Sequence, residues 1–294
     1  MWIYLNNQFV KDDEALISVF DHGFLYGDGV FETLRSYGPR LFMADEHLAR
    51  LFRSAEAIGL TIPIPLKNWT DILYEAMARN GVGTDQHDAY LRITVSRGAG
   101  EIGLDPALCR TPTVVVMAKP LIVPAPHLYE TGVRVIIAST KRNLSDALSP
   151  QIKTTNFLNN IQAKREALAA GVFDSILLNW EGHATESTVS NLFFVRKGCL
   201  HTPTLECGLL DGITRKLVLQ LAKDGGLSVE EGHYTADHLH QADECFLTNT
   251  SMEIMPVTSI DNRPVGDGKP GSVTAQLRAH FLKMRGQCCD QHPF

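Results

Sequence analysis

The chain has 294 residues, of which 44% are hydrophobic and 20% charged, and its formal net charge is −6. This composition is typical of a globular protein long enough for two domains, and its acidic balance disfavours nucleic-acid binding. The sequence contains no apolar run of about 18 residues that could cross a membrane, and no signal peptide is expected at its N-terminus. Six cysteines without CxxC spacing indicate reduced thiols, so we expect a cytoplasmic protein.

Periodicity in the first part of the chain predicts strands and helices in alternation. Apolar and polar residues alternate over residues 2–10 and again over 29–43, which predicts two hairpins. Residues 44–60 have apolar side chains at helical spacing, which predicts an amphipathic helix. A second helix is predicted over 69–82, closed by Asn80-Gly81.

The next segments predict two strands and a boundary. Residues 88–98 alternate as a strand, with Tyr90 and Arg92 on one face and Leu91, Ile93 and Val95 on the other. The apolar run at 111–120 predicts a strand buried on both faces. Three prolines, at positions 120, 124 and 126, and little periodicity mark residues 121–128 as an interdomain linker.

The remainder of the chain predicts a β-rich domain that carries helices. The domains are therefore expected to be a small α/β domain at 1–120 and a larger domain at 129–294, and the fold class is α/β (α+β). Helices are predicted over about 156–170 and 212–223. Strands are predicted at residues 132–140, 173–180, 190–198 and 243–250.

Several familiar motifs are missing or incomplete. Residues 266–271 match GxGxxG, but they include a proline and follow no clear strand, so a dinucleotide site is not supported. The sequence has no GxxxxGK[ST] and no GxSxG. His233, His238 and His240 could ligate a metal, yet no flanking motif completes a zinc site, so we expect a solvated helix face and no metal.

Other segments carry residues that suit an anionic or carbonyl ligand, each with an ordinary structural alternative. Gly212 and Thr214 open an amphipathic helix whose first N–H groups could bind an anion or simply be capped. The strand at 246–254 ends in hydroxyl and amide side chains that suit phosphate or a turn. Glu186 could face solvent or a cationic nitrogen, and Arg50 could be a surface charge.

Lys153 is the remaining candidate, because it follows an isoleucine in a segment with no other charge, "SPQIKTTNFLNNIQ". A lysine becomes nucleophilic when burial or neighbouring cations lower its pKa. Taken together, the candidates supply an amine, a carboxylate, an arginine and two phosphate-binding segments. This is the inventory that pyridoxal 5'-phosphate requires.

These residues lie in stretches that resemble the class IV aminotransferases, the fold-type IV pyridoxal-phosphate enzymes. The resemblance covers essentially the whole chain and implies a small N-terminal α/β domain, a larger pseudo-barrel domain, and an active site near their interface in a homodimer. The stretches that carry it are "FDHGFLYGDGVFETLRSY", "EHLARLFRSA", "AYLRITVSRG", "IKTTNFLNNIQAKREA", "ATESTVSNLFF", "LLDGITRKL" and "DECFLTNTSMEIMPV".

The resemblance also implies roles for individual residues. Lys153 is the expected Schiff-base lysine and proton shuttle, and Glu186 holds the pyridine nitrogen protonated. Phosphate is expected to bind to Arg50, Ile213, Thr214 and Thr250, while Leu210 packs against the cofactor ring. The substrate side is expected to be lined by Tyr26, Phe31, Thr33, Arg35, Tyr90 and Arg92.

Within the family, the chain is most similar to prokaryotic branched-chain amino acid aminotransferases. The implied reaction is a ping-pong transfer from a branched-chain L-amino acid to a 2-oxo acid such as 2-oxoglutarate. Thr33 replaces the glycine usual in those enzymes, and Phe157 replaces a tyrosine. D-amino acid transaminase and aminodeoxychorismate lyase therefore stay open as alternatives.

Overall fold

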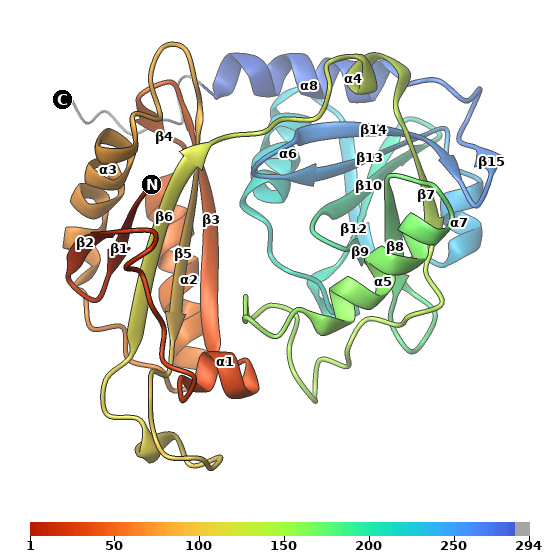
Figure 1. Cartoon of the computed structure of the whole chain (residues 1–294). Helices are drawn as coiled ribbons and strands as arrows, with labels where there is room; N and C mark the ends of the chain where they lie inside the picture. The colour runs from red at the N-terminus through yellow and green to blue at the C-terminus, as the bar shows by residue number, and fades with distance from the viewer. Residues whose placement is uncertain (286–294) are drawn as a thin grey trace. The chain divides into compact units, whose positions relative to one another are not determined.

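The computed structural model describes residues 1–285, which form two compact units (Figure 1). Among the described residues, unit 1 comprises Met1–Ile122, Ile152–Asn156 and Arg285. Unit 2 comprises Val123–Gln151 and Phe157–Met284. The short segment Ile152–Asn156, which carries Lys153, thus belongs to unit 1 although the residues on both sides of it belong to unit 2.

Unit 1 is built on a six-stranded antiparallel sheet in the order β2-β1-β6-β5-β3-β4. Both predicted hairpins are confirmed, and the first turns at Asn6 and Asn7, whose positive φ angles suit a tight two-residue turn. The strands are β1 (Trp2–Leu5), β2 (Gln8–Lys11), β3 (Gly29–Tyr37), β4 (Arg40–Leu41), β5 (Ala89–Ser96) and β6 (Thr113–Pro120).

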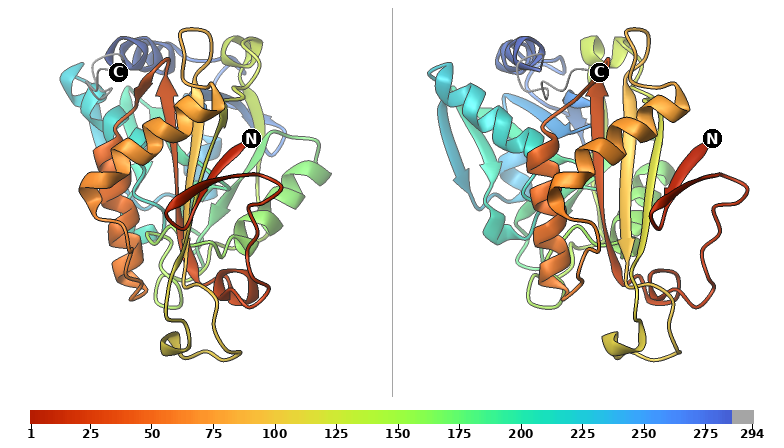
Figure 2. Two further views of the ribbon diagram at one scale, coloured as in Figure 1. Left: turned by 60° about the vertical axis from the view of Figure 1, so that its left-hand side comes forward. Right: turned by 90° about the vertical axis from the view of Figure 1, so that its left-hand side faces the viewer.

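Helices α2 (Ala44–Ala57) and α3 (Trp69–Asn80) cover one face of this sheet, as Figure 2 shows. Their apolar side chains pack on Leu91 and Ile93, so the predicted division of β5 into two faces is confirmed. Strand β6 also alternates between buried and partly exposed residues. The expectation that it is buried on both faces is wrong, because within unit 1 the helices cover only one face. The short helix α1 (His22–Tyr26) precedes β3.

Unit 2 contains a closed ring of strands, which confirms the predicted pseudo-barrel. Each strand pairs with the next, and β9 pairs with β10 to close the ring. In ring order the strands are β10 (Asn191–Arg196), β13 (Glu244–Asn249), β14 (Glu253–Ile260), β7 (Val133–Ile137), β8 (Asp174–Leu178) and β9 (Ala184–Ser187).

Further elements extend this ring. Strand β11 (Cys199–Pro203) pairs with β10, β12 (Ser228–Gly232) pairs with β11, and β15 (Arg263–Pro264) pairs with β14. Helix α5 packs on β8, and α8 packs on α6, β13 and β14. The helices are α4 (His127–Thr131), α5 (Leu158–Ala169), α6 (Ile213–Asp224), α7 (Ala236–His240) and α8 (Ser272–Met284).

The three histidines considered as ligands have separate partners. His238 accepts a hydrogen bond from Thr235 N at 3.1 Å and so caps α7, while His240 pairs with Asp261 at 3.0 Å. His233 lies against Cys207. Within residues 1–285, no helix combines the length and the apolar character needed to span a bilayer. Cys288 and Cys289 lie outside the described residues.

Candidate active site

Lys153 is held at the edge of the sheet of unit 1 by its own backbone. Phe31 N donates to Lys153 O at 2.9 Å, Thr155 N donates to Gly29 O at 2.9 Å, and Lys153 N donates to Ser54 Oγ at 3.2 Å. The segment 152–156 therefore forms a short extension of the sheet beside β3. Gly29 is closely packed on both sides, since a Cβ there would lie 2.8 Å from Val95 O on β5 and 3.3 Å from Thr155 Oγ1 in this segment.

The side chain of Lys153 lies over an aromatic ring. Its Nζ atom is 4.6 Å from the centroid of Phe31, and Arg92 Cζ is 3.9 Å from the same centroid. Phe31 is buried, so the ring faces these cations in a partly desolvated setting. Two positive charges thus converge on one ring, which is an environment suited to a lysine amine and to a carboxylate ligand.

Five of the six predicted substrate residues share one face of this sheet. Thr33 pairs with Arg92 and Arg35 with Tyr90 across β3 and β5, and Phe31 lies two residues before Thr33 on the same face. This is the face opposite the α2–α3 core. Arg35 is buried there and pairs with Asp88 at 2.6 Å.

Tyr26, the sixth predicted substrate residue, lies at the end of α1 and accepts a hydrogen bond from Gly103 N at 3.2 Å.

Arg50 is part of a buried charged triad with Glu32 and His47. Arg50 Nε donates to Glu32 Oε1 at 2.6 Å and Nη2 to Oε2 at 3.0 Å, a bidentate pair, and His47 Nδ1 lies 2.8 Å from Oε2. Glu32 and His47 have side chains with no exposure to solvent. Arg50 is 6% exposed, so it is not the surface charge that the sequence allowed as an alternative.

Burial and the neighbouring charges have opposing effects on the pKa values of Glu32 and His47. Burial raises the pKa of Glu32, but the charge of Arg50 and the hydrogen bond from His47 outweigh it, so the pKa lies well below the glutamate range. Burial lowers the pKa of His47, and the charges of Arg50 and Lys153 add to this against the opposing effect of Glu32. The triad is therefore an anionic glutamate, a cationic arginine and a neutral histidine.

Glu186 lies on β9 in unit 2 and is 5% exposed. Arg142 Nε donates to its Oε1 at 3.0 Å, and Leu210 N donates to its Oε2 at 3.1 Å. Arg142 is fixed in turn by hydrogen bonds to the side chains of Asn143 and Asn159. The carboxylate is thus oriented by two N–H donors, as a partner for a cationic nitrogen must be.

Helix α6 begins at a tightly packed glycine. A Cβ at Gly212 would lie 1.9 Å from Asn191 Oδ1, and Gly212, as the N-cap residue, has no side chain with which to cap the N–H groups that open the helix. Asn191 Nδ2 donates to Leu210 O at 2.8 Å, which fixes the backbone that leads into the helix. The N-terminus of α6, with Ile213 and Thr214, therefore presents a backbone cradle for an anion.

A buried hydroxyl lies next to this cradle. Thr248 pairs with Asn191 across β13 and β10, so their side chains share a face. Thr248 Oγ1 is buried without a hydrogen-bond partner among the described residues. Thr250 follows directly after β13, in a turn that Asn249 Oδ1 fixes through the N–H groups of Ser251 and Met252. The end of β13 thus offers hydroxyl groups beside the start of α6.

The family model for class IV aminotransferases (Amino-transferase class IV) matches residues 29–260. The chain belongs to this family. Among curated relatives of this aminotransferase, a putative branched-chain-amino-acid aminotransferase of Methanocaldococcus jannaschii is 42% identical over 97% of the chain and 96% of the relative. D-alanine aminotransferase of Bacillus licheniformis is 34% identical over 95% of both chains. Aminodeoxychorismate lyase of Bacillus subtilis is 32% identical over 96% and 94%.

Solved structures of the same family resemble the aminotransferase closely. The branched-chain amino acid aminotransferase of Escherichia coli gives a TM-score of 0.93 at 28% identity, covering 99% of this chain and 96% of that one. The branched-chain amino acid aminotransferase of Thermoproteus uzoniensis with norvaline gives 0.88 at 33% identity, covering 97% and 94%. A further branched-chain enzyme, solved with pyridoxamine 5'-phosphate, gives 0.92 at 34% identity, covering 97% and 94%. The chain is therefore an enzyme of the transaminase family with the corresponding fold.

Some site residues of this aminotransferase were not predicted from its sequence. Glu32 had a usable signal, because a glutamate between Val30 and Leu34 occupies an inward position of an alternating strand and requires a buried partner. His47 and Arg50, three residues apart on one helix face, supply that partner. Arg142 and Asn191 had no comparable signal, since their contacts lie far away in the sequence.

Proposed function

We propose that the enzyme is a pyridoxal-phosphate-dependent transaminase that moves the amino group of a branched-chain L-amino acid to a 2-oxo acid such as 2-oxoglutarate. The observation that carries the cofactor assignment is the oriented, buried Glu186 together with the glycine-opened cradle of α6. The unpartnered Thr248 hydroxyl beside that cradle, within the described residues, also fits a phosphate group. The carboxylate of Glu186 therefore suits the pyridine nitrogen of the cofactor, and the start of α6 with the Thr248 hydroxyl suits its phosphate.

When bound, pyridoxal phosphate supplies an aldehyde that bonds to amines and a ring that withdraws electrons from the substrate α-carbon. Lys153 Nζ supplies the amine for that aldehyde and carries the proton removed from the α-carbon. Glu186 keeps the ring nitrogen protonated, and Arg142 keeps Glu186 oriented. Leu210 donates its N–H to Glu186 and would pack against the ring.

The remaining residues bind charged groups. Arg50 and the N–H groups of Ile213 and Thr214, together with Thr250, hold the phosphate through charge-assisted hydrogen bonds. Arg92, stacked on Phe31 at 3.9 Å, is suited to a substrate carboxylate. Tyr26, Thr33, Arg35 and Tyr90 shape the remainder of the substrate side.

The substrate assignment is supported by the names of the relatives and by the residues near Lys153. The apolar ring of Phe31 suits an aliphatic side chain, and the M. jannaschii relative carries a branched-chain name. Thr33 is β-branched and lies beside Arg92 in the register of the sheet, while Phe157 opens α5 without the hydroxyl of a tyrosine. These two residues favour D-amino acid transaminase, or aminodeoxychorismate lyase, as the second candidate.

Half-reactions with single amino donors separate these functions. Mixing the holoenzyme with L-leucine is expected to replace the visible absorbance of the aldehyde cofactor by that of the amine form. D-alanine is expected to convert it more slowly, and aminodeoxychorismate is expected to yield no pyruvate. Full conversion by D-alanine without conversion by L-leucine would assign the D-amino acid function, and pyruvate release would assign the lyase.

We further propose that the enzyme is a cytoplasmic homodimer. Exposed apolar side chains gather on two neighbouring segments of unit 1, where Gly100 N donates to Phe20 O and Gly103 N to the Tyr26 hydroxyl. Such a patch is typical of a protein interface. The exposed side chains of this patch are Leu16, Val19, Phe20, Phe24, Ile102 and Leu104. Sedimentation at the mass of a single chain would contradict the dimer.

A further inference from the structure

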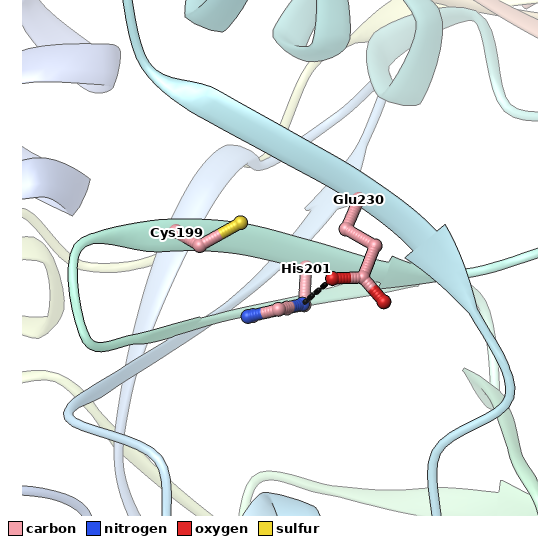
Figure 3. A group of neighbouring side chains, drawn as sticks. All are labelled: Cys199, His201 and Glu230. Carbon is pink, nitrogen blue, oxygen red and sulfur yellow. Dashed lines mark ion pairs between the residues drawn. The ribbon is translucent and has the colours of Figure 1, made fainter.

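Three groups able to ligate a metal lie together on β11 and β12, outside the closed ring of unit 2. Cys199 and His201 are two residues apart on β11, so their side chains share a face of the strand. Glu230 lies directly opposite His201 in the parallel register of β12. Figure 3 shows the Glu230 carboxylate reaching from β12 toward His201, with Cys199 beside them.

The distances suit a small cation with three protein ligands. His201 Nδ1 lies 3.7 Å from Glu230 Oε2, and the Cys199 sulfur lies within 4.8 Å of both groups. Tetrahedral zinc with bonds of about 2.0–2.2 Å to nitrogen and oxygen holds these donors about 3.4 Å apart. Small rotations of Cys199 and of Glu230, whose side chain is 63% exposed, would bring all three to bonding distance.

A second group of similar composition in unit 2 lacks this convergence. His233 Nδ1 lies 3.6 Å from Cys207 Sγ, but its other ring nitrogen, Nε2, faces Glu206 at 3.5 Å. Since the two ring nitrogens point away from each other, one cation cannot bind Cys207, His233 and Glu206 together. At the first group, by contrast, His201 Nδ1 faces Glu230, and one donor atom from each of the three residues lies within 4.8 Å of the other two, so the donors can share an ion.

We propose that Cys199, His201 and Glu230 form a site for a divalent cation of the zinc class, with water as the fourth ligand. Sulfur, imidazole and carboxylate are the ligands that zinc uses in proteins, and a thiolate disfavours magnesium and calcium. On binding, the Cys199 thiol releases its proton to solvent and the neutral His201 ring carries its proton on Nε2. None of the three residues belongs to the proposed cofactor or substrate set.

The environment of His201 supports a fixed ligand. Its ring stacks on Phe194 at 4.9 Å between centroids, and its Nδ1 lies 3.1 Å from the Tyr234 hydroxyl. The Tyr234 hydroxyl also donates to Glu230 O at 3.2 Å, so this hydroxyl keeps a hydrogen bond when Nδ1 exchanges its contact with Tyr234 for the ion. The imidazole is thus oriented before a cation binds, which is what a binding site requires.

Metal titration of the untagged full-length enzyme tests this proposal. Because Cys288 and Cys289 could bind zinc by themselves, the titrations use the Cys288→Ser/Cys289→Ser background as well as the natural chain. We expect one Zn²⁺ per chain, and with Co²⁺ a near-ultraviolet band from thiolate-to-cobalt charge transfer. Cys199→Ser is expected to remove the band, and Glu230→Gln to weaken Zn²⁺ affinity by at least about tenfold.

Two single variants, Glu230→Gln and His233→Ala, distinguish zinc binding at this site from zinc binding elsewhere on the chain. Glu230→Gln alters an exposed side chain and so keeps the fold even if Cys199→Ser does not. His233→Ala removes a histidine that the proposal leaves out, and it is expected to keep the affinity within about twofold. Zinc binding that is absent, that disappears in the Cys288→Ser/Cys289→Ser background, or that Cys199→Ser and Glu230→Gln leave unchanged would overturn the proposal.

Discussion

Replacing Lys153 by alanine is expected to lower the rate of transamination by at least about 10³-fold while the fold is kept. Proton transfer by one positioned group contributes about 10²–10⁴ in rate, and Lys153 also supplies the amine that bonds the cofactor. The hydrogen bonds that fix its segment involve backbone atoms of Lys153, which alanine retains. The lost contact with the buried Phe31 ring costs only about 1–2 kcal/mol. Steady-state kinetics and thermal unfolding measure the two effects.

Two other variants make this test specific. Lys153→Arg keeps a cation over Phe31 but cannot bond the aldehyde, so it is expected to be equally inactive. Lys164→Ala removes a lysine on α5 whose side chain is 40% exposed, and it is expected to retain activity. Borohydride reduction is expected to attach cofactor to the natural chain but not to Lys153→Ala. Covalent attachment to the alanine variant would show that another lysine has this role.

Much of the fold could be predicted because its signals are local. The alternation of β5 and the helical spacing of residues 44–60 each depend on near neighbours, and both elements were placed correctly. Closure of the ring in unit 2 depends instead on the pairing of β10 with β13 and of β7 with β14. These pairings join strands that are far apart in the sequence, with other helices and strands between them, and no short pattern encodes them.

In the candidate site, too, some features could be predicted from the sequence, and the contacts that fix them could not. Lys153, Glu186 and the start of α6 each had an ordinary structural alternative when taken singly, and they could be proposed because together they match the needs of pyridoxal phosphate and lie in stretches that resemble the class IV aminotransferases. What fixes them could not be predicted. Arg142 reaches Glu186 across 44 residues, and Lys153 depends on a hydrogen bond to Ser54, 99 residues away. The proposed zinc-class site could not be predicted for a related reason. It depends on the parallel pairing of β12 with β11, which places Glu230 opposite His201, and β12 was not predicted as a strand.

Substituting Glu32 by glutamine is expected to destabilise unit 1 by about 3–5 kcal/mol, because it breaks the buried, bidentate ion pair between Glu32 and the Arg50 guanidinium. Glutamine preserves the size of the side chain, so the effect reports the lost charge and not a cavity. Because the pKa of Glu32 is depressed in the folded protein, its charge stabilises the fold above the ordinary glutamate pKa near 4.5. The contribution is lost as the pH falls from there toward the depressed value, so the difference between the two proteins narrows in acid.

A double substitution separates stability from cofactor binding. Replacing both charges, as in Glu32→Leu with Arg50→Met, removes the buried guanidinium together with the buried carboxylate. It is expected to restore most of the stability measured by denaturant unfolding of the cofactor-free protein. Cofactor affinity is not expected to return, because methionine cannot bind phosphate. If Glu32→Gln unfolds within about 0.5 kcal/mol of the natural chain, the pair is not the buried ion pair described above. If the double variant binds cofactor normally, Arg50 does not hold the phosphate.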